Sequence, residues 1–323
     1  TAMLRIKKCT VFLLLLCLLL NLAGCAAAQK PLRVTLVLKT VTEVAEFWGT
    51  LLSGVEKAAE EYGVELKVLT SPREIDIDKQ IELIRQVTAD KPDVMILSAA
   101  DYDRCAEATE EAIAAGIGVV AIDTDVNAAG RACFVGSNSY EIGLEMGRAM
   151  ASYLPEGGKV AVIQHMLTTT TGIERTRGVL DALNEAGNIE ILGSFCCDNS
   201  TEQAQTITTE LLSADPEIRG FVCTNEVCNV GAANALVELG MGGRVYVVGC
   251  DNSQRQIQFL EQNIIQAIVT QRPFNMGYVA VQQAVRVANG EQTDDFVEVS
   301  CVLITRENMY TQENQKLLFP VLR

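Results

Sequence analysis

Five hydrogen-bonding side chains and one aromatic pair follow apolar, β-branched runs of the chain, and together they could bind a small polar ligand. They are Asp123, Arg175, Asn225, Asp251 and Gln271, with Phe47-Trp48 as the pair. Carboxylates accept hydrogens from neighbouring hydroxyl groups, arginine donates through a rigid fork, and amides both donate and accept. Flat aromatic faces suit the C–H face of a sugar ring. We therefore predict a site for a neutral polyhydroxylated ligand.

Each of these residues also has a purely structural interpretation. Phe47-Trp48 could fix a helix start to the core, and Arg175 could pair with an acidic neighbour on the surface. Asp123 and Asp251 could be turn residues, and Asn225 could cap the helix that follows it. We favour ligand contact because Asp123 and Asp251 end similar apolar runs in the two halves of the chain, "GIGVVAID" and "GRVYVVGCD".

Composition excludes several other classes of function. The 323 residues hold 26 Lys and Arg against 41 Asp and Glu, a net charge of −15, which repels nucleic-acid backbones. The single histidine, His165, rules out a multi-histidine metal site, and we interpret it as a packed or solvated residue. The segment "GIGVVA" (116–121) matches the glycine pattern of a dinucleotide-binding fingerprint. It precedes a strand-like run, however, whereas the fingerprint must follow a strand and open a helix. We expect no catalytic residue, metal or cofactor.

The elements that must position these side chains alternate regularly. Between Leu32 and Ile304, twelve short β-branched runs alternate with nine stretches of helical periodicity. Strands that are apolar on both faces and separated by helices indicate parallel sheets covered on both sides. Twelve strands exceed one ordinary sheet, so we predict an α/β fold of two doubly wound lobes. Ligands of such sheets bind at the carboxyl ends of the strands, where the polar residues above fall.

The first 25 residues carry the pattern of an export signal. A basic start is followed by an apolar run from Val11 to Leu20, which is too short to span a bilayer. The run leads into Leu22-Ala23-Gly24-Cys25, which resembles the bacterial lipoprotein signal and implies lipidation of Cys25. An ordinary secretory signal and a buried helix are the alternatives. We predict a signal peptide over 1–24 and a tether over 25–31.

Eight cysteines follow Cys25, and most of them lie within strand-like runs. There they would act as small apolar side chains. Cys196-Cys197 and Cys223 with Cys228 are the pairs that a disulfide would favour, but we expect free buried thiols.

A series of motifs over roughly residues 32–310 resembles the type I periplasmic sugar-binding proteins of the ribose and galactose class. In chain order they include "EFWGTLLSGVEKAAEEYGVEL", "GIGVVAIDTD", "IERTRG", "CTNEVCNVGAANAL", "VVGCDNS" and "TQRPFNMGYVAV". The resemblance implies two lobes joined by a three-strand hinge and closing over a ligand, and it assigns ligand contact to the seven residues above. It places the crossings near Gly136-Ser137, Gln271-Arg272 and Ser300-Cys301. It implies an N-terminal lobe of 32–136 plus 272–300 and a C-terminal lobe of 137–271 plus 301–323.

Two departures from the family pattern bear on the ligand. Relatives place Asn and Pro where this chain has Ala45-Glu46, so that one hydroxyl contact is either missing or replaced by Glu46, Glu43 or Thr42. A common aromatic wall in the second lobe is replaced by Cys197-Asp198-Asn199.

The sequence thus predicts a lipid-anchored solute-binding protein on the extracytoplasmic face of a bacterial cell membrane. Its partners would be a sugar or sugar-like polyol and an ABC permease, without nucleic acid, and we expect a monomer. One alternative is a ligand-sensing subunit for a membrane kinase or chemoreceptor. Another is a secreted glycoside hydrolase using Asp123 and Asp251, which we disfavour because both carboxylates should stay ionised beside an arginine.

Overall fold

The computed structural model describes residues 30–41 and 46–319. The predicted signal peptide, Cys25 and most of the tether lie outside the described residues, as do Thr42 and Glu43. Within the described part, no helix is both long enough and apolar enough to cross a membrane.

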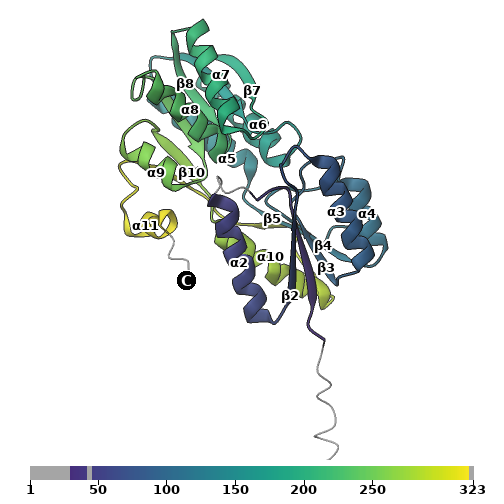
Figure 1. The fold of residues 1–323 in the computed structure, drawn as a ribbon. Helices are drawn as coiled ribbons and strands as arrows, with labels where there is room; N and C mark the ends of the chain where they lie inside the picture. Colours follow the sequence, from purple (N-terminus) through teal and green to yellow (C-terminus); the bar gives the residue numbers. More distant parts are fainter. Residues whose placement is uncertain (1–29, 42–45, 320–323) are drawn as a thin grey trace, which may run out of the picture. The chain divides into compact units, whose positions relative to one another are not determined.

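Two six-stranded sheets form the framework of the described residues (Figure 1). The first contains β1 (Arg33–Leu38), β2 (Glu65–Thr70), β3 (Val94–Leu97), β4 (Gly118–Ile122), β5 (Cys133–Gly136) and β11 (Phe296–Glu298). The second contains β6 (Gly158–Gln164), β7 (Ile189–Cys196), β8 (Ile218–Cys223), β9 (Tyr246–Cys250), β10 (Ala267–Thr270) and β12 (Val302–Thr305). Their strand orders are β11-β5-β4-β3-β1-β2 and β12-β10-β9-β8-β6-β7.

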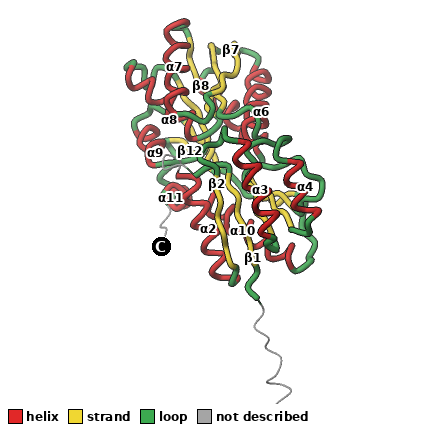
Figure 2. The backbone as a smooth tube through the Cα atoms, turned by 45° about the vertical axis from the view of Figure 1, so that its right-hand side comes forward, coloured by secondary structure: helices red, strands yellow, loops and turns green. Residues whose placement is uncertain are grey.

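Helices cover both faces of each sheet, as Figure 2 shows by colour. The first sheet carries α2 (Glu46–Tyr62), α3 (Ile77–Asp90), α4 (Ala106–Ala114) and α10 (Pro273–Ala288). The second carries α5 (Ser139–Tyr153), α6 (Thr170–Ala186), α7 (Thr201–Ala214), α8 (Glu226–Glu238), α9 (Gln254–Glu261) and α11 (Gln312–Leu318). We call the first sheet with its helices the N-terminal lobe and the second the C-terminal lobe.

The cores lie between each sheet and its helices, because the strands are apolar on both faces. In the N-terminal lobe, Met95 and Leu97 pack toward α3 and α4, while α2 and α10 pack together on the opposite face. In the C-terminal lobe, α5 and α6 share one core, to which Val162 belongs, and α7, α8 and α9 share another, to which Phe221 belongs.

The predicted fold class is confirmed, with differences in detail. Within residues 30–41 and 46–319, the chain passes between the sheets after β5, after β10 and after β11. The pairing of β12 with β10 is antiparallel, whereas the apolar pattern predicted parallel strands. The reason is that β12 enters the second sheet directly from β11 without a crossover helix, and side-chain pattern does not encode strand direction. The short helix α11 was not predicted, so the described residues hold ten helices rather than nine.

Candidate functional site

All seven residues that the sequence predicted as ligand contacts line one cavity between the two sheets. The cavity has a volume of about 410 Å³, counting space open to solvent. Its walls come from both lobes, and its lining includes Phe47, Trp48, Asp123, Arg175, Asn225, Asp251 and Gln271. Residues up to 224 positions apart in the chain therefore meet because parallel strands direct their carboxyl ends to the same edge of each sheet.

Asp123 and Asp251 occupy equivalent positions in the two lobes. Asp123 follows β4 and donates its backbone N–H to Val135 of β5 at 3.0 Å, while Asp251 follows β9 and donates to Val269 of β10 at 2.9 Å. Both adopt left-handed backbone conformations, with φ of 62° and 70°. Aspartate tolerates this region better than most residues, and strain of this kind gathers at functional sites. The conformation turns each carboxylate from its strand end into the cavity.

Arg175 and Gln271 hold the Asp251 carboxylate from two sides. Gln271 donates from Nε2 to Asp251 Oδ1 at 2.6 Å, and Arg175 NH1 lies 3.9 Å from Asp251 Oδ2. Arg175 also donates to the Thr224 carbonyl at 2.9 Å. Burial opposes the charge of Arg175, but neighbouring anionic groups including Asp251 and Asp123 outweigh it and raise the pKa of the guanidinium. Arg175 Nε is buried and has no hydrogen-bond partner among the described residues, so it is free to donate to a ligand.

Asn225 performs the capping role that was its structural alternative, and it also lines the cavity. Its Oδ1 accepts the backbone N–H of Cys228 at 3.0 Å, which caps α8. Its Nδ2 donates to Asn199 Oδ1 at 2.8 Å. One side chain thus serves the helix and the cavity together.

The aromatic pair stands at the start of α2 and closes one side of the cavity. The Phe47 and Trp48 rings meet edge to face, with centroids 5.1 Å apart. The Lys39 ammonium lies 5.7 Å from the Trp48 ring centroid. Glu46, the proposed substitute for a family hydroxyl contact, instead accepts the backbone N–H of Gln254 at 3.2 Å and does not line this cavity.

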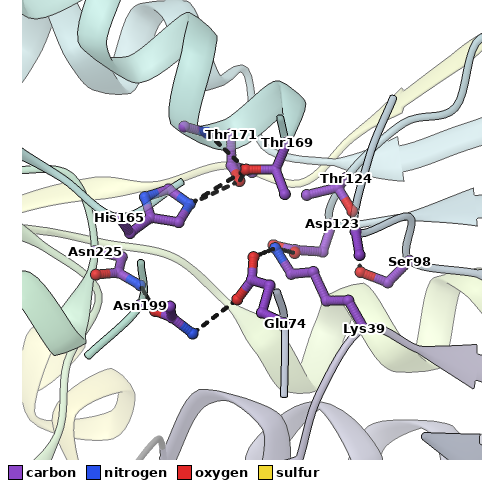
Figure 3. Close-up of polar contacts among 12 residues, drawn as sticks. Lys39, Glu74, Ser98, Asp123, Thr124, His165, Thr169, Thr171, Asn199 and Asn225 are labelled. Atoms are coloured by element: carbon purple, nitrogen blue, oxygen red, sulfur yellow. Dashed lines mark hydrogen bonds and ion pairs between the residues drawn. The ribbon is translucent and has the colours of Figure 1, made fainter. Parts of the chain in front are cut away.

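Lys39 and Glu74 form a buried charge cluster with Asp123 (Figure 3). Lys39 Nζ lies 2.8 Å from Glu74 Oε1 and 3.3 Å from Asp123 Oδ2, and all three side chains are buried. Burial lowers the pKa of Lys39, but the two carboxylates outweigh it and hold the pKa above its usual value. Lys39 therefore stays charged and orients the Asp123 carboxylate.

His165 is a packed residue, in agreement with its predicted role, but it also lines the cavity. Its Nδ1 lies 2.7 Å from Thr224 Oγ1, and its Nε2 lies 3.2 Å from Thr171 Oγ1. Burial, with Lys39 and Arg175 nearby, lowers the pKa of the imidazole well below its usual value. The ring is therefore neutral at physiological pH.

Glu226 lies beside Asp251 and is also buried in the cavity wall. Burial, with the Asp251 charge, raises the pKa of Glu226 to about 8. Its Oε2 has no hydrogen-bond partner among the described residues. At neutral pH this carboxyl group is protonated and can donate to a ligand oxygen.

Sequence reasoning therefore missed four polar residues of the cavity wall, namely Lys39, Glu74, Asn199 and Glu226. For Thr171, the sequence left open whether its threonine-rich loop contacts ligand or is only a connection, and the structure places Thr171 in the wall. Lys39 directly follows β1 and Glu74 lies in the loop after β2, so the strand-end rule would have found both. Glu226 could have been inferred as the neighbour of Asn225. Asn199 had been noted only as a departure from an aromatic wall.

Several hydrogen bonds join the two lobes around the cavity. Asn199 Nδ2 donates to Glu74 Oε2 at 2.8 Å, which Figure 3 shows together with the Asn225 contact. The Thr168 hydroxyl donates to the Ala100 carbonyl at 2.9 Å, and Tyr102 N–H donates to the Thr168 carbonyl at 3.0 Å. The threonine-rich loop before α6 is therefore a contact between lobes.

The arrangement suits binding of a neutral ligand that carries several hydroxyl groups. Two cations, three carboxylates and a carboxyl group of raised pKa surround the cavity, so charges of opposite sign largely balance. Donors and acceptors line the cavity together with an aromatic pair, which suits a hydroxyl-bearing ring.

Comparisons with known proteins agree with this geometry. The family described as "periplasmic binding protein domain" matches residues 35–292. The D-allose-binding periplasmic protein of Escherichia coli K12 is 25% identical over 90% of this chain and 96% of its own length. The D-ribose/D-allose-binding protein of Pseudomonas aeruginosa is 26% identical over 86% of this chain and 89% of its own.

Solved structures extend the similarity to three dimensions. An ABC transporter periplasmic solute binding protein from Actinobacillus succinogenes, solved with bound D-allose, superposes with a TM-score of 0.79. It is 26% identical, and the match covers 86% of this chain and 98% of that one.

Proposed function

Because the chain belongs to the periplasmic binding protein family, we propose that it binds a neutral sugar between its lobes and passes it to an ABC importer. The observation that supports this most is that one cavity is lined by all seven predicted contact residues, with Asp123 and Asp251 in equivalent positions. The relatives that bind D-allose or D-ribose make an aldohexose or aldopentose the first ligand to test.

The cavity residues divide into three roles in this proposal. Asp123 and Asp251 accept hydroxyl hydrogens, while Arg175 and protonated Glu226 donate to ring or hydroxyl oxygens. Phe47 and Trp48 cover the C–H face of the ring. Asn225 and Gln271 both accept and donate; Gln271 also holds the Asp251 carboxylate, and Asn225 is hydrogen-bonded to Asn199.

Binding would favour closure of the lobes. Contacts from both lobes are satisfied together only when the cavity is closed, so a ligand shifts the equilibrium toward that form. The lobes would comprise 32–136 plus 272–300 and 137–271 plus 301–323. The ligand is not altered chemically.

The site of action would be the extracytoplasmic face of the cell membrane. The basic, apolar and Leu22-Ala23-Gly24-Cys25 segments of the sequence support an exported protein held by lipid on Cys25. The acidic balance of the chain supports a partner other than nucleic acid. We expect a monomer that meets its permease through both lobes.

A thermal-shift screen tests the proposal directly. D-Allose, D-ribose, D-arabinose and D-galactose are compared with glucose 6-phosphate as a charged control. A ligand that binds only the native state stabilises it by about 2.7 kcal/mol when the free ligand concentration is one hundred times Kd. The melting temperature therefore rises. We expect at least one neutral sugar to raise it and the phosphate ester to leave it unchanged. A shift from the ester alone would contradict a site for neutral sugars.

A further inference from the structure

Two buried thiols from separate elements contact each other beside the cavity. Cys197 follows the end of β7, and Cys228 lies in the first turn of α8. Their sulfur atoms are 3.4 Å apart, and both side chains are fully buried. Neither of the pairs singled out from the sequence is the pair that meets, because β7 and α8 bring together residues 31 positions apart.

Each thiol is close in the chain to a residue of the cavity wall. Asn199 is two residues after Cys197, and Asn225 caps the turn that holds Cys228. The two asparagine side chains are hydrogen-bonded to each other at 2.8 Å. Whatever fixes Cys197 to Cys228 therefore also fixes this asparagine pair.

The backbone around Cys197 holds its sulfur in place. Its N–H donates to the Gln164 carbonyl and its own carbonyl accepts from Ser200, both at 2.9 Å. Asp198 and Asn199 between them have positive φ values of 50° and 54°, which form a tight left-handed turn. These backbone hydrogen bonds and the turn fix the position of the Cys197 backbone next to α8.

The two thiols also differ in their acidity. The hydrogen bond from Cys228 lowers the pKa of Cys197, whereas burial raises that of Cys228. The thiolate is the nucleophile in disulfide exchange, so Cys197 is the thiol that attacks first.

We propose that Cys197 and Cys228 are a disulfide-forming site that fixes the Asn199–Asn225 edge of the cavity. The oxidant is a low-molecular-weight disulfide, such as oxidised glutathione. During refolding or local opening, which exposes these buried sulfurs, Cys197 thiolate attacks it, forming a mixed disulfide and releasing one thiolate. Cys228 sulfur then attacks Cys197 sulfur, releasing the second thiol. The net reaction converts two protein thiols and one small disulfide into one protein disulfide and two small thiols.

The expected consequence is a stiffer cavity edge. A disulfide closing a loop of this length restricts the unfolded chain and stabilises the folded one. We expect the melting temperature of the oxidised protein to rise by about 5–10 °C, reversed by dithiothreitol. We also expect amide exchange in residues 197–203 to slow roughly tenfold on oxidation, since local opening becomes less favourable.

The experiment oxidises the purified chain with glutathione in two arms, one folded and one refolding from denaturant. Trypsin places Cys196 and Cys197 in one peptide (178–219), and Cys223 and Cys228 in another (220–244). Mass spectrometry should find these two peptides linked in at least one arm. Cys197→Ser and Cys228→Ser should abolish the link, whereas Cys196→Ser and Cys223→Ser should retain it.

Cys105→Ser is the matched control, because Cys105 is equally buried but its sulfur contacts Gln80 instead of a thiol. It should leave both the link and the melting shift unchanged. The wild-type link and its reversal by dithiothreitol remain informative if a serine variant does not fold. Absence of the link in both arms, or its loss in Cys196→Ser or Cys223→Ser, would overturn the proposal. Sugar binding plays no part in this test.

Discussion

Asp123 and Asp251 show how single residues define the site. Each stands one residue beyond a buried strand, in a left-handed conformation that directs its carboxylate into the cavity. Each also has a cationic neighbour, Lys39 for Asp123 and Arg175 for Asp251. Each lobe thus contributes one carboxylate to the lining, so the cavity offers acceptors from both lobes to one ligand.

The first prediction concerns the charge of Asp251. Asp251→Asn keeps the shape and tolerates the positive φ, but it removes the charge that Arg175 and Gln271 face. Hydrogen bonds to charged groups contribute about 1.5–3 kcal/mol, so the Kd for sugar should rise roughly 10- to 100-fold in a calorimetric titration. Asp181→Asn, at an exposed position bonded to Tyr140, is the control. If Asp251→Asn and Asp181→Asn bound sugar with equal affinity, Asp251 would not be a ligand contact.

The second prediction concerns pH. Glu226 has a folded-state pKa raised to about 8 by burial and Asp251, above its usual 4.5. Below pH 4.5 the carboxyl is protonated in both states, and its stabilising effect is fully present. Between pH 4.5 and 8 the unfolded chain loses the proton while the folded chain keeps it, so the free energy of unfolding falls.

Denaturant unfolding at pH 5.5 and 8.5 measures this effect. Wild type should lose stability on the order of a few kcal/mol across the interval, and Glu226→Gln should lose clearly less. If both proteins change equally with pH, Glu226 does not have the raised pKa.

Close helix packing positions the residues of the cavity at the level of elements. A Cβ atom on Gly143 of α5 would lie 2.2 Å from the Arg175 carbonyl oxygen of α6. A Cβ atom on Gly178 of α6 would lie 2.2 Å from the Tyr140 carbonyl oxygen of α5. The two helices therefore approach backbone to backbone at the turn that carries Arg175.

The third prediction follows from this contact. Gly143→Ala must push α6 away from α5, which should cost about 1–3 kcal/mol of stability and weaken sugar binding by moving Arg175. Gly49→Ala is the control, since a Cβ there meets nothing within 4 Å and alanine favours the helix. Chemical denaturation and sugar titration of both variants check it. If Gly143→Ala changed neither stability nor sugar affinity, the two helices would be able to separate without effect on the site.

The elements that sequence predicted well are those with long buried patterns. The β4 and β9 strands end one residue before Asp123 and Asp251, where the apolar runs stop, and both aspartates line the cavity as this pattern predicted. Periodicity does not specify strand direction, so β12 was predicted as a strand but its antiparallel direction was not. Helix α11 is seven residues long with little apolar repeat, and its signal is the Thr311 cap. Lys39 was overlooked because its burial depends on partners distant in the chain, Glu74 and Asp123.

At the scale of the whole molecule, the proposed function depends on an equilibrium between open and closed lobes. The Thr168 contacts with Ala100 and Tyr102 join the lobes without forming part of the cavity lining. They would contribute to the closed form and not to the open one. Residues outside the binding cavity can therefore change the apparent affinity.

The fourth prediction tests that idea with a near-isosteric change. Thr168→Val removes the hydrogen bond to the Ala100 carbonyl, and the Kd for sugar should rise about three- to tenfold as closure becomes less favourable. Thr206→Val loses a similar bond, to Glu202 within α7, and should leave the Kd unchanged. Small-angle scattering with sugar present should find Thr168→Val more open than wild type. If Thr168→Val and Thr206→Val had the same Kd for sugar, the Thr168 contact would have no part in lobe closure.

Tryptophan fluorescence measures the central claim most directly, because Trp48 is the single tryptophan of the chain and lines the cavity. Titration with D-allose, D-ribose, D-arabinose and D-galactose should give, for at least one sugar, a saturable one-site change in emission. Asp251→Asn should shift that curve to higher concentration. An emission that no neutral sugar alters, or a curve that Asp251→Asn leaves in place, would contradict binding at this cavity.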